Sequence, residues 1–302
     1  MSISEVEWID GIKKKIQYMA NNVWDGITYT EVEEFMTNFS EKDQIVGWAL
    51  LDMLIYYSNE QEESIISNLI RLVKRDIWIT QEVEKRDISS QNIEKAFSEI
   101  FEKMCFVPVD ESDTSASSFN ITGQFKKSRA VPNKIEYIKL LDVPLMIAMH
   151  YKYFIFYDDI IGTGTQFSRF WKKTQFGNSK KYSLIDLVEN NPDACFYYLV
   201  FGGYQEGIDK IKKNIPKLKI IVSEYFPKNA DILNEENEYW ELNPQLKKKV
   251  IDFIMEKEKE LDFTDKYSKH LPVLFQHGRA SNTALSLYWN SKDSLWHELY
   301  KR

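Results

Sequence analysis

The chain has 302 residues, which is enough for one large domain or two ordinary ones. Its apolar fraction of 43%, with 17 Tyr and 18 Phe, excludes an intrinsically disordered chain. The formal net charge of −7 argues against nucleic-acid binding by the whole surface, although a local basic face stays possible. Cys105 and Cys195 are too few for a disulfide framework or a four-cysteine zinc site. Both stand among apolar residues, which predicts small core residues of a reduced, cytoplasmic protein.

The N-terminal stretch lacks the apolar core of a signal peptide. The most apolar window, residues 45–57, contains Asp52 and is shorter than the about 20 residues of a membrane span. We therefore expect no membrane partner, and we interpret this window as part of a buried helix over residues 41–57.

Residues 1–104 are predicted to form an all-α N-terminal unit. This stretch contains no proline, and the apolar residues Ile65, Leu69 and Leu72 recur at helical spacing. Thr30 and Glu33 have the spacing of a capping box at the start of a helix.

Residues 105–302 change to alternating strand and helix patterns. The expected strands cover residues 105–110, 152–159, 195–203, 217–226 and 271–277. The expected helices cover residues 135–149, 165–173, 205–214 and 246–261. Continuous apolar strands separated by helices are typical of a doubly wound, mostly parallel sheet that is covered on both faces. Residues 227–269 are acidic and helical, and we interpret them as an insertion in this α/β domain.

In an open parallel sheet, ligands bind beyond the carboxyl ends of the strands. The sharpest feature at such an end is FIFYDDIIGTGTQ, in which an apolar strand meets Asp158 and Asp159 and then a loop of glycine and threonine before a helix. Glycines let backbone amides approach an anion, and the helix N-terminus favours negative charge. The carboxylates suit a neutral diol or a hydrated divalent cation. Together they describe a site for a sugar phosphate.

This sequence resembles the phosphoribosyl-pyrophosphate motif of type I phosphoribosyltransferases. The resemblance implies that the catalytic residues Asp158 and Asp159 bind the ribose hydroxyls, with Mg²⁺ held beside them through water. It also implies a ligand-binding segment, which comprises Ile161, Gly162, Thr163, Gly164, Thr165 and Gln166 and holds the 5′-phosphate from Gly162 onward. Gln166 stands where the usual motif has a second threonine, so Thr165 would have to replace it.

Three other strand ends supply further candidates. Ser115 and Ser117 follow the first strand, where the family carries its pyrophosphate loop, but ordinary loop chemistry is an alternative. Gly202 and Gly203 would let a base or pyrophosphate approach the backbone, or form a tight turn. Arg279 lies beside His277 at the end of the last strand, where a ligand contact and a surface loop are both open.

The rest of the chain looks more like the phosphoribosyltransferase-like effectors of bacterial conflict systems, including those linked to retrons. The resemblance implies an anti-phage defence effector that binds phosphoribosyl pyrophosphate or a nucleotide. Its activity would be that of a glycosyltransferase, or cleavage of a nucleotide glycosidic bond. A reverse transcriptase–nucleic acid complex of a retron is the implied macromolecular partner.

Two alternatives use the same fold without catalysis. The first is a nucleotide-sensing module, which Gln166 favours together with the acidic loop after the first strand, opened by Asp110, Glu111 and Asp113. The second is a nucleoprotein-docking module, to which three basic runs at residues 126–134, 172–181 and 210–219 would contribute if they shared a face. The sequence leaves the oligomeric state open.

Overall fold

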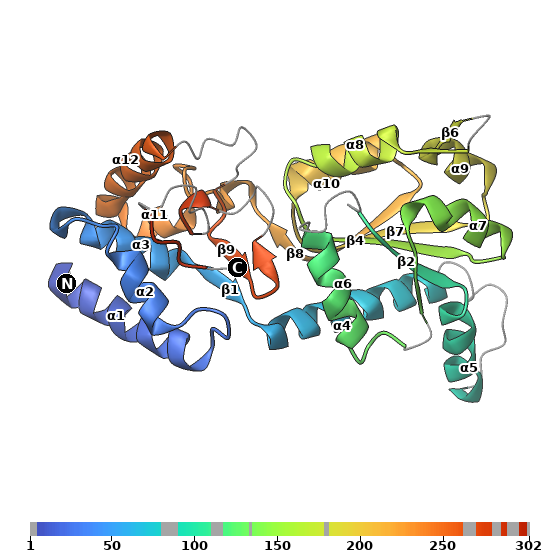
Figure 1. Cartoon of the computed structure of the whole chain (residues 1–302), viewed down its shortest axis with the longest axis horizontal. Helices are drawn as coiled ribbons and strands as arrows, with labels where there is room; N and C mark the ends of the chain where they lie inside the picture. Colours follow the sequence, from blue (N-terminus) through green and yellow to red (C-terminus); the bar gives the residue numbers. More distant parts are fainter. Residues whose placement is uncertain are drawn as a thin grey trace. The chain divides into compact units, whose positions relative to one another are not determined.

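The computed structural model describes residues 5–79, 90–109, 117–132, 135–177, 181–261, 270–279, 285–288 and 296–300. The chain forms two compact units (Figure 1), which we describe separately. The split unit comprises Met1–Glu62 and Pro227–Arg302, and the central unit comprises Glu63–Phe226. These units do not coincide with the predicted division after residue 104.

The central unit contains a five-stranded sheet in the order β3-β2-β4-β7-β8. Its strands are β2 (Met104–Pro108), β3 (Glu136–Tyr137), β4 (Tyr153–Ile161), β7 (Cys195–Tyr204) and β8 (Leu218–Phe226). Each neighbouring pair in this order is parallel. The three long strands are rich in aromatic and β-branched residues, and every residue of β4 is buried. The predicted α/β class with a parallel sheet is confirmed.

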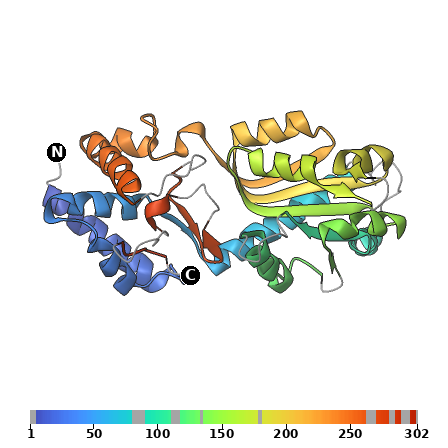
Figure 2. The same ribbon diagram turned by 45° about the horizontal axis from the view of Figure 1, so that its top comes forward.

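Helices cover both faces of this sheet (Figures 1 and 2), as the continuous apolar strands predicted. One face carries α7 (Val143–Ala148), α8 (Thr165–Lys173), α9 (Leu184–Asn190) and α10 (Gln205–Asn214); the other carries α4 (Asn59–Ile77) and α6 (Ser117–Lys127). The Phe156 ring meets Trp171 of α8, with ring centroids 5.7 Å apart. On the opposite face, the Tyr157 hydroxyl shares a 2.6 Å hydrogen bond with Thr122 of α6, and Tyr197 donates to Asp76 of α4.

Smaller elements complete the central unit. These are α5 (Ser90–Phe101), the short antiparallel pair β5 (Gln175–Phe176) and β6 (Tyr182–Ser183), and the 3-10 helix η3 (Leu140–Asp142). The helix predicted over residues 135–149 is only partly right. Its first residues form β3, which extends the sheet beside β2, and the α-helical part is limited to α7.

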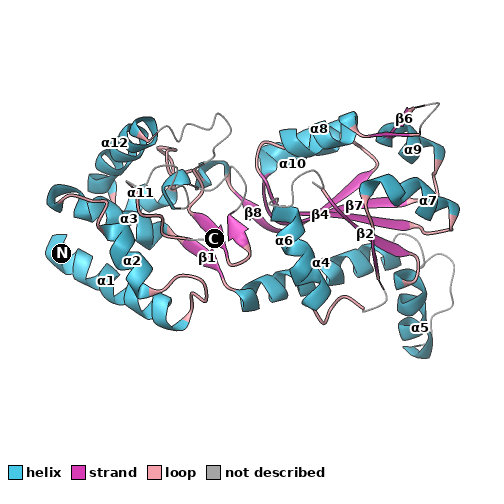
Figure 3. Cartoon of the chain, viewed as in Figure 1, coloured by secondary structure: helices cyan, strands magenta, loops and turns pink. Residues whose placement is uncertain are grey.

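The split unit joins the N-terminal helices to the segment after Phe226 (Figure 3). Its helices are α1 (Glu5–Asn22), α2 (Tyr29–Met36), α3 (Gln44–Met53), α11 (Glu238–Leu242) and α12 (Pro244–Glu260), with 3-10 turns η1 (Glu41–Asp43), η4 (Lys228–Ala230) and η6 (Ser286–Tyr288). Trp240 and Phe253 belong to the same core as Ile16 and Phe35. The segment predicted as an insertion in the α/β domain therefore packs on the N-terminal helices instead.

A small sheet in the split unit corrects two predictions. β1 (Ile55–Tyr57) pairs in parallel with β9 (Val273–Phe275), and β10 (Gly278–Arg279) pairs antiparallel with β9. The helix predicted over residues 41–57 stops at Met53 because Leu54 turns to extended backbone and three strong strand formers follow. The strand predicted at residues 271–277 pairs with β1 and is not a member of the five-stranded sheet.

Capping also differs from the predicted pattern by two residues. Thr28, rather than Thr30, caps α2, and its hydroxyl accepts a hydrogen bond from the amide of Glu31. The Glu31 carboxylate in turn accepts from the Thr28 amide at 2.6 Å. Among the helices in the described part of the chain, none has the combination of length and apolar character that a membrane span requires.

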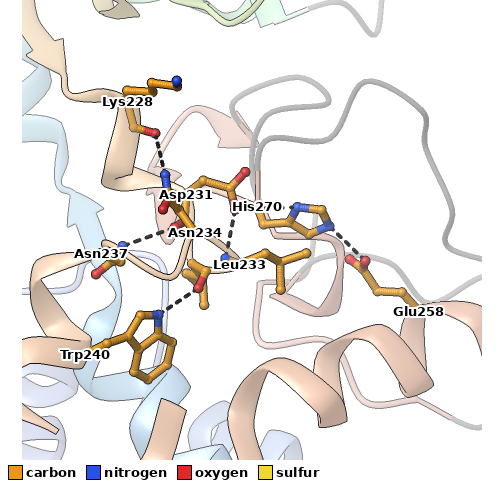
Figure 4. A network of polar contacts seen from close by, with 9 residues as sticks. Lys228, Asp231, Leu233, Asn234, Asn237, Trp240, Glu258 and His270 are labelled. Atoms are coloured by element: carbon orange, nitrogen blue, oxygen red, sulfur yellow. Dashed lines mark hydrogen bonds and ion pairs between the residues drawn. The ribbon is translucent and has the colours of Figure 1, made fainter. Parts of the chain in front are cut away.

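Two histidines of the split unit lie against carboxylates. The His277 ring nitrogen Nδ1 is 2.9 Å from a Glu62 carboxylate oxygen, and both side chains are enclosed, with 2% and 0% exposed. His270 contacts Glu258 of α12 at 2.9 Å through Nε2 and lies 3.7 Å from Asp231 through Nδ1 (Figure 4). Both histidines thus tie together segments far apart in the chain.

Candidate functional site

The predicted ligand segment lies between β4 and α8 in the central unit. β4 runs two residues beyond its predicted end, because Ile160 and Ile161 still pair with Gly202 and Gly203 of β7. Asp158 and Asp159 therefore lie within the strand. β4 ends at Ile161, and three loop residues separate it from α8, which begins at Thr165.

Asp158 and Asp159 are enclosed carboxylates, only 5% and 1% exposed. Each accepts a hydrogen bond from the amide of the next residue, Asp158 from Asp159 at 3.0 Å and Asp159 from Ile160 at 2.6 Å. Tyr198 of β7 donates its hydroxyl to Asp158 at 3.4 Å. Burial, then the charges of Asp158 and Asp159, raise the pKa of Tyr198 well above its ordinary value, so the phenol stays a neutral donor.

The loop after β4 is shaped by Gly164, whose φ of +67° lies in the left-handed region that favours glycine. Thr163 donates its hydroxyl to the Thr165 hydroxyl oxygen at 3.0 Å. Gln166 is exposed in the first turn of α8, whereas the Ile161 side chain is buried in the core. Among the predicted ligand-binding residues, Ile161 is therefore buried, and the hydroxyls of Thr163 and Thr165 lie beside the N-terminus of α8.

Gly202 and Gly203 lie inside β7 and form no turn. A Cβ built on Gly202 would be 2.3 Å from the Phe226 ring, and one on Gly203 would be 3.1 Å from Ile208. The protein's own packing thus accounts for Gly202, whereas a side chain at Gly203 would require a small shift of Ile208.

The other candidates are less well placed. Ser115 lies outside the described residues, and Ser117 begins α6 with a side chain that is not described. Arg279 belongs to β10 of the split unit, so the expectation that its strand end joins those of the five-stranded sheet is wrong. The reason is the pairing of β9 with β1, which takes this segment into another sheet.

One neighbouring residue was missed by sequence reasoning as an individual candidate. Lys210 of α10 donates its ammonium group to the Thr165 hydroxyl oxygen at 2.8 Å. In the sequence it is one of several lysines in a basic run, and only the packing of α10 beside α8 brings it to the loop (Figure 1).

The donor chemistry of the site can be compared with the needs of Mg²⁺. Within the described ranges, no group of three or more His, Cys, Asp and Glu side chains gathers as a metal cage. Mg²⁺ commonly keeps several waters and takes only one or two carboxylates together with substrate phosphates. Asp158 and Asp159 provide two such carboxylates, which fits an ion held through water and ligand oxygens.

Comparison with known proteins identifies one matching family. A family model described as PRTase-CE matches residues 32–302. The solved structure of the AQ2163 protein from Aquifex aeolicus is 10% identical in sequence and has a TM-score of 0.28, with 66% of this chain and 83% of that chain covered. A TM-score this low carries no argument. No curated protein matches the chain.

Proposed function

The chain belongs to the PRTase-CE family of phosphoribosyltransferase-like proteins, and we propose that it binds phosphoribosyl pyrophosphate or a nucleotide at the loop between β4 and α8. The proposed activity is transfer of the ribosyl group to an acceptor, or cleavage of a nucleotide glycosidic bond. The observation that supports it best is the order of parts in one segment: a buried parallel strand, two carboxylates, a glycine–threonine loop and a helix N-terminus.

Each part of the segment has a role in this proposal. The amides of the loop and of the first turn of α8 would hold the 5′-phosphate, since a helix N-terminus offers unpaired N–H groups and a positive dipole end. The hydroxyls of Thr163 and Thr165 would donate to phosphate oxygens. Asp158 and Asp159 would accept hydrogen bonds from the ribose hydroxyls. Their enclosure means that neighbouring side chains must move before a ligand reaches them.

The reaction requires charge separation at the ribose C1 carbon. The bond from C1 to the leaving pyrophosphate oxygen or base nitrogen breaks, and the leaving group keeps the electron pair. An acceptor or water forms the new bond to C1 and releases a proton to solvent. Mg²⁺, when bound through water, would offset the charge of the phosphate groups. The carboxylates would stabilise the positive charge that develops on the ribose ring.

We extend the proposal to a biological role as an effector of bacterial anti-phage defence. The resemblance to conflict-system effectors supports this role and a retron reverse transcriptase–nucleic acid complex as partner. Expression of the wild type and of the Asp158→Asn/Asp159→Asn variant in bacteria tests it. We expect growth arrest or phage protection from the wild type only, and equal effects of both proteins would reject a role for this site.

A second candidate is a non-catalytic nucleotide-sensing or nucleoprotein-docking module. The enclosure of both carboxylates favours it, because a site this closed suits a ligand that is held rather than turned over. Under this reading the ligand would bind without chemical change.

Two measurements on the full chain separate the candidates. Calorimetric titration of phosphoribosyl pyrophosphate with Mg²⁺ tests binding by the wild type and the double Asn variant, and pyrophosphate release tests turnover. Binding that the variant loses supports the proposed site, and turnover by the wild type then supports the enzyme. Binding without turnover across a panel of nucleobases, nucleotides and water favours the sensor. No binding of phosphoribosyl pyrophosphate by the wild type rules out that ligand, and the same titration with nucleoside 5′-monophosphates then decides whether the site binds a nucleotide.

A further inference from the structure

Lys210 makes a side-chain hydrogen bond to Thr165, which is not expected of a lysine that only solvates the face of a helix. Its Nζ atom donates to the Thr165 hydroxyl oxygen at 2.8 Å. The same oxygen lies 3.0 Å from the donating hydroxyl of Thr163. A hydroxyl oxygen has two lone pairs and one proton. With both lone pairs engaged, the Thr165 hydroxyl can act only as a donor toward a third group.

The free donors around Thr165 point to an anion as that third group. An ammonium group has three N–H bonds and no acceptor, and the bond to Thr165 uses one of them. The other two N–H bonds of Lys210, the Thr165 hydroxyl proton and the amides that follow Thr165 in the first turn of α8 are donors, whereas the Thr165 amide itself donates to the Thr163 hydroxyl at 3.4 Å. A phosphoryl group, with several acceptor oxygens and a negative charge, matches this set.

The position of Lys210 is fixed by close packing one turn earlier in α10. A Cβ built on Gly207 would lie 2.1 Å from the carbonyl oxygen of Gly162 and 2.9 Å from the amide nitrogen of Gly164. The first turn of α10 is therefore in direct contact with the backbone of the loop. Because residues three apart lie on one helix face, Lys210 follows Gly207 toward the same loop.

We propose that Lys210 makes this loop select a phosphorylated ribosyl ligand over its uncharged counterpart. This inference rests on the proposed function and adds a specificity-determining residue from outside the β4–α8 segment. The ligand class is a 5′-phosphorylated pentose or nucleotide, and the matched ribose or nucleoside would bind weakly.

The test compares ribose 5-phosphate with ribose, titrated into the full chain in the presence of Mg²⁺. The variants are Lys210→Met and the control Lys212→Met, which removes an exposed charge from the same helix. Because charged hydrogen bonds are worth more than neutral ones, we expect Lys210→Met to weaken ribose 5-phosphate binding about 10- to 100-fold. We expect Lys212→Met to change it less than about 2-fold, as for a screened surface charge. Lys210→Arg, which keeps the charge, should recover part of the affinity.

The outcomes keep the two proposals apart. Equal affinities of Lys210→Met and Lys212→Met for ribose 5-phosphate would overturn the inference and leave the proposed function standing. A wild type that binds none of ribose 5-phosphate, phosphoribosyl pyrophosphate and a nucleoside 5′-monophosphate would overturn both. Lys210 is exposed, so we expect unchanged thermal unfolding in the variant. A wild type that binds ribose as tightly as ribose 5-phosphate would also reject the inference.

Discussion

The two units of the chain differ in the groups that contact their buried carboxylates. In the split unit, Glu62 and Glu258 each meet a histidine ring at 2.9 Å. In the central unit, the contacts of Asp158 and Asp159 include hydrogen bonds from two backbone amides and the Tyr198 hydroxyl. The carboxylates of the split unit join distant segments of one unit, whereas Asp158 and Asp159 lie in the segment that carries the proposed ligand site. The difference predicts opposite consequences of mutation in the two units.

The largest expected effect is on stability and follows from His277→Leu. The substitution removes the ring that contacts the fully enclosed Glu62, while the backbone amide at position 277 can still donate to it; removing one partner of a buried pair typically costs about 3–5 kcal/mol. Denaturant unfolding measures the loss. The control is His297→Leu at an exposed position, which should change stability by less than about 0.5 kcal/mol. If both variants unfolded at the same denaturant concentration, the pairing in the split unit would have no structural role.

In the central unit, Asp158→Asn and Asp159→Asn should affect the reaction and spare the fold. Loss of one electrostatic contact to a transition state costs roughly 10²–10³ in rate, or about 2.7–4 kcal/mol. Stability should stay about equal, because each substitution keeps the size of the side chain and an oxygen that can accept the amide hydrogen bond. Turnover and thermal unfolding of the same samples check this. Marked destabilisation with residual turnover would reverse the comparison between the units.

Gly207→Ala is expected to have a smaller effect, which should appear in both stability and ligand binding. The new methyl group would meet the Gly162 carbonyl oxygen at 2.1 Å, and such overpacking typically costs about 1–3 kcal/mol. Displacement of the loop should also weaken ribose 5-phosphate binding. Gly123→Ala in α6 is the control, since a Cβ there has no neighbour within 4 Å and alanine favours helix by up to about 1 kcal/mol. Equal stabilities of the two variants would show that the loop backbone shifts to accommodate the methyl group without a cost in stability.

The sequence predicted the central unit better than the split unit, for a physical reason. β4, β7, β8, α8 and α10 are long, continuous runs whose apolar pattern decides their structure locally. The strands β1 and β9 have three residues each, and β1 pairs with β9 across most of the chain. Such pairing leaves no local periodicity, so β1 was predicted as helix and β9 was assigned to the wrong sheet.

The candidate site shows the same limit at the level of residues. The pattern of two aspartates, glycines and threonines was visible because all its members are adjacent in one segment. Lys210 comes 45 residues after Thr165, so only the packing of two helices shows the contact. The reason for Gly202 was also hidden, because the Phe226 ring that fills its space belongs to the next strand.

The smallest expected effect concerns the pH dependence of stability. It tests the contacts of His270 with Glu258 and Asp231 in the split unit. Burial alone would lower the pKa of His270, but its hydrogen bond to Glu258 and the charges of Glu258 and Asp231 outweigh burial and raise the pKa. A folded-state pKa above the unfolded value means that protonated His270 stabilises the fold. This contribution is complete below the unfolded pKa, near 6.5, and is lost as the pH rises through the folded pKa.

His270→Gln keeps a hydrogen-bonding side chain and removes the charge. We expect it to lower stability by about 1.5 kcal/mol at pH 6, as for one charge-assisted hydrogen bond. The difference from the wild type should shrink as the pH rises above 6.5 and through the folded pKa, because the wild type then loses its own charge. Thermal and denaturant unfolding across this range measure the difference. A difference that stayed constant with pH would mean that His270 acts through packing alone. Its contacts with Glu258 and Asp231 would then stabilise the split unit by shape rather than by charge.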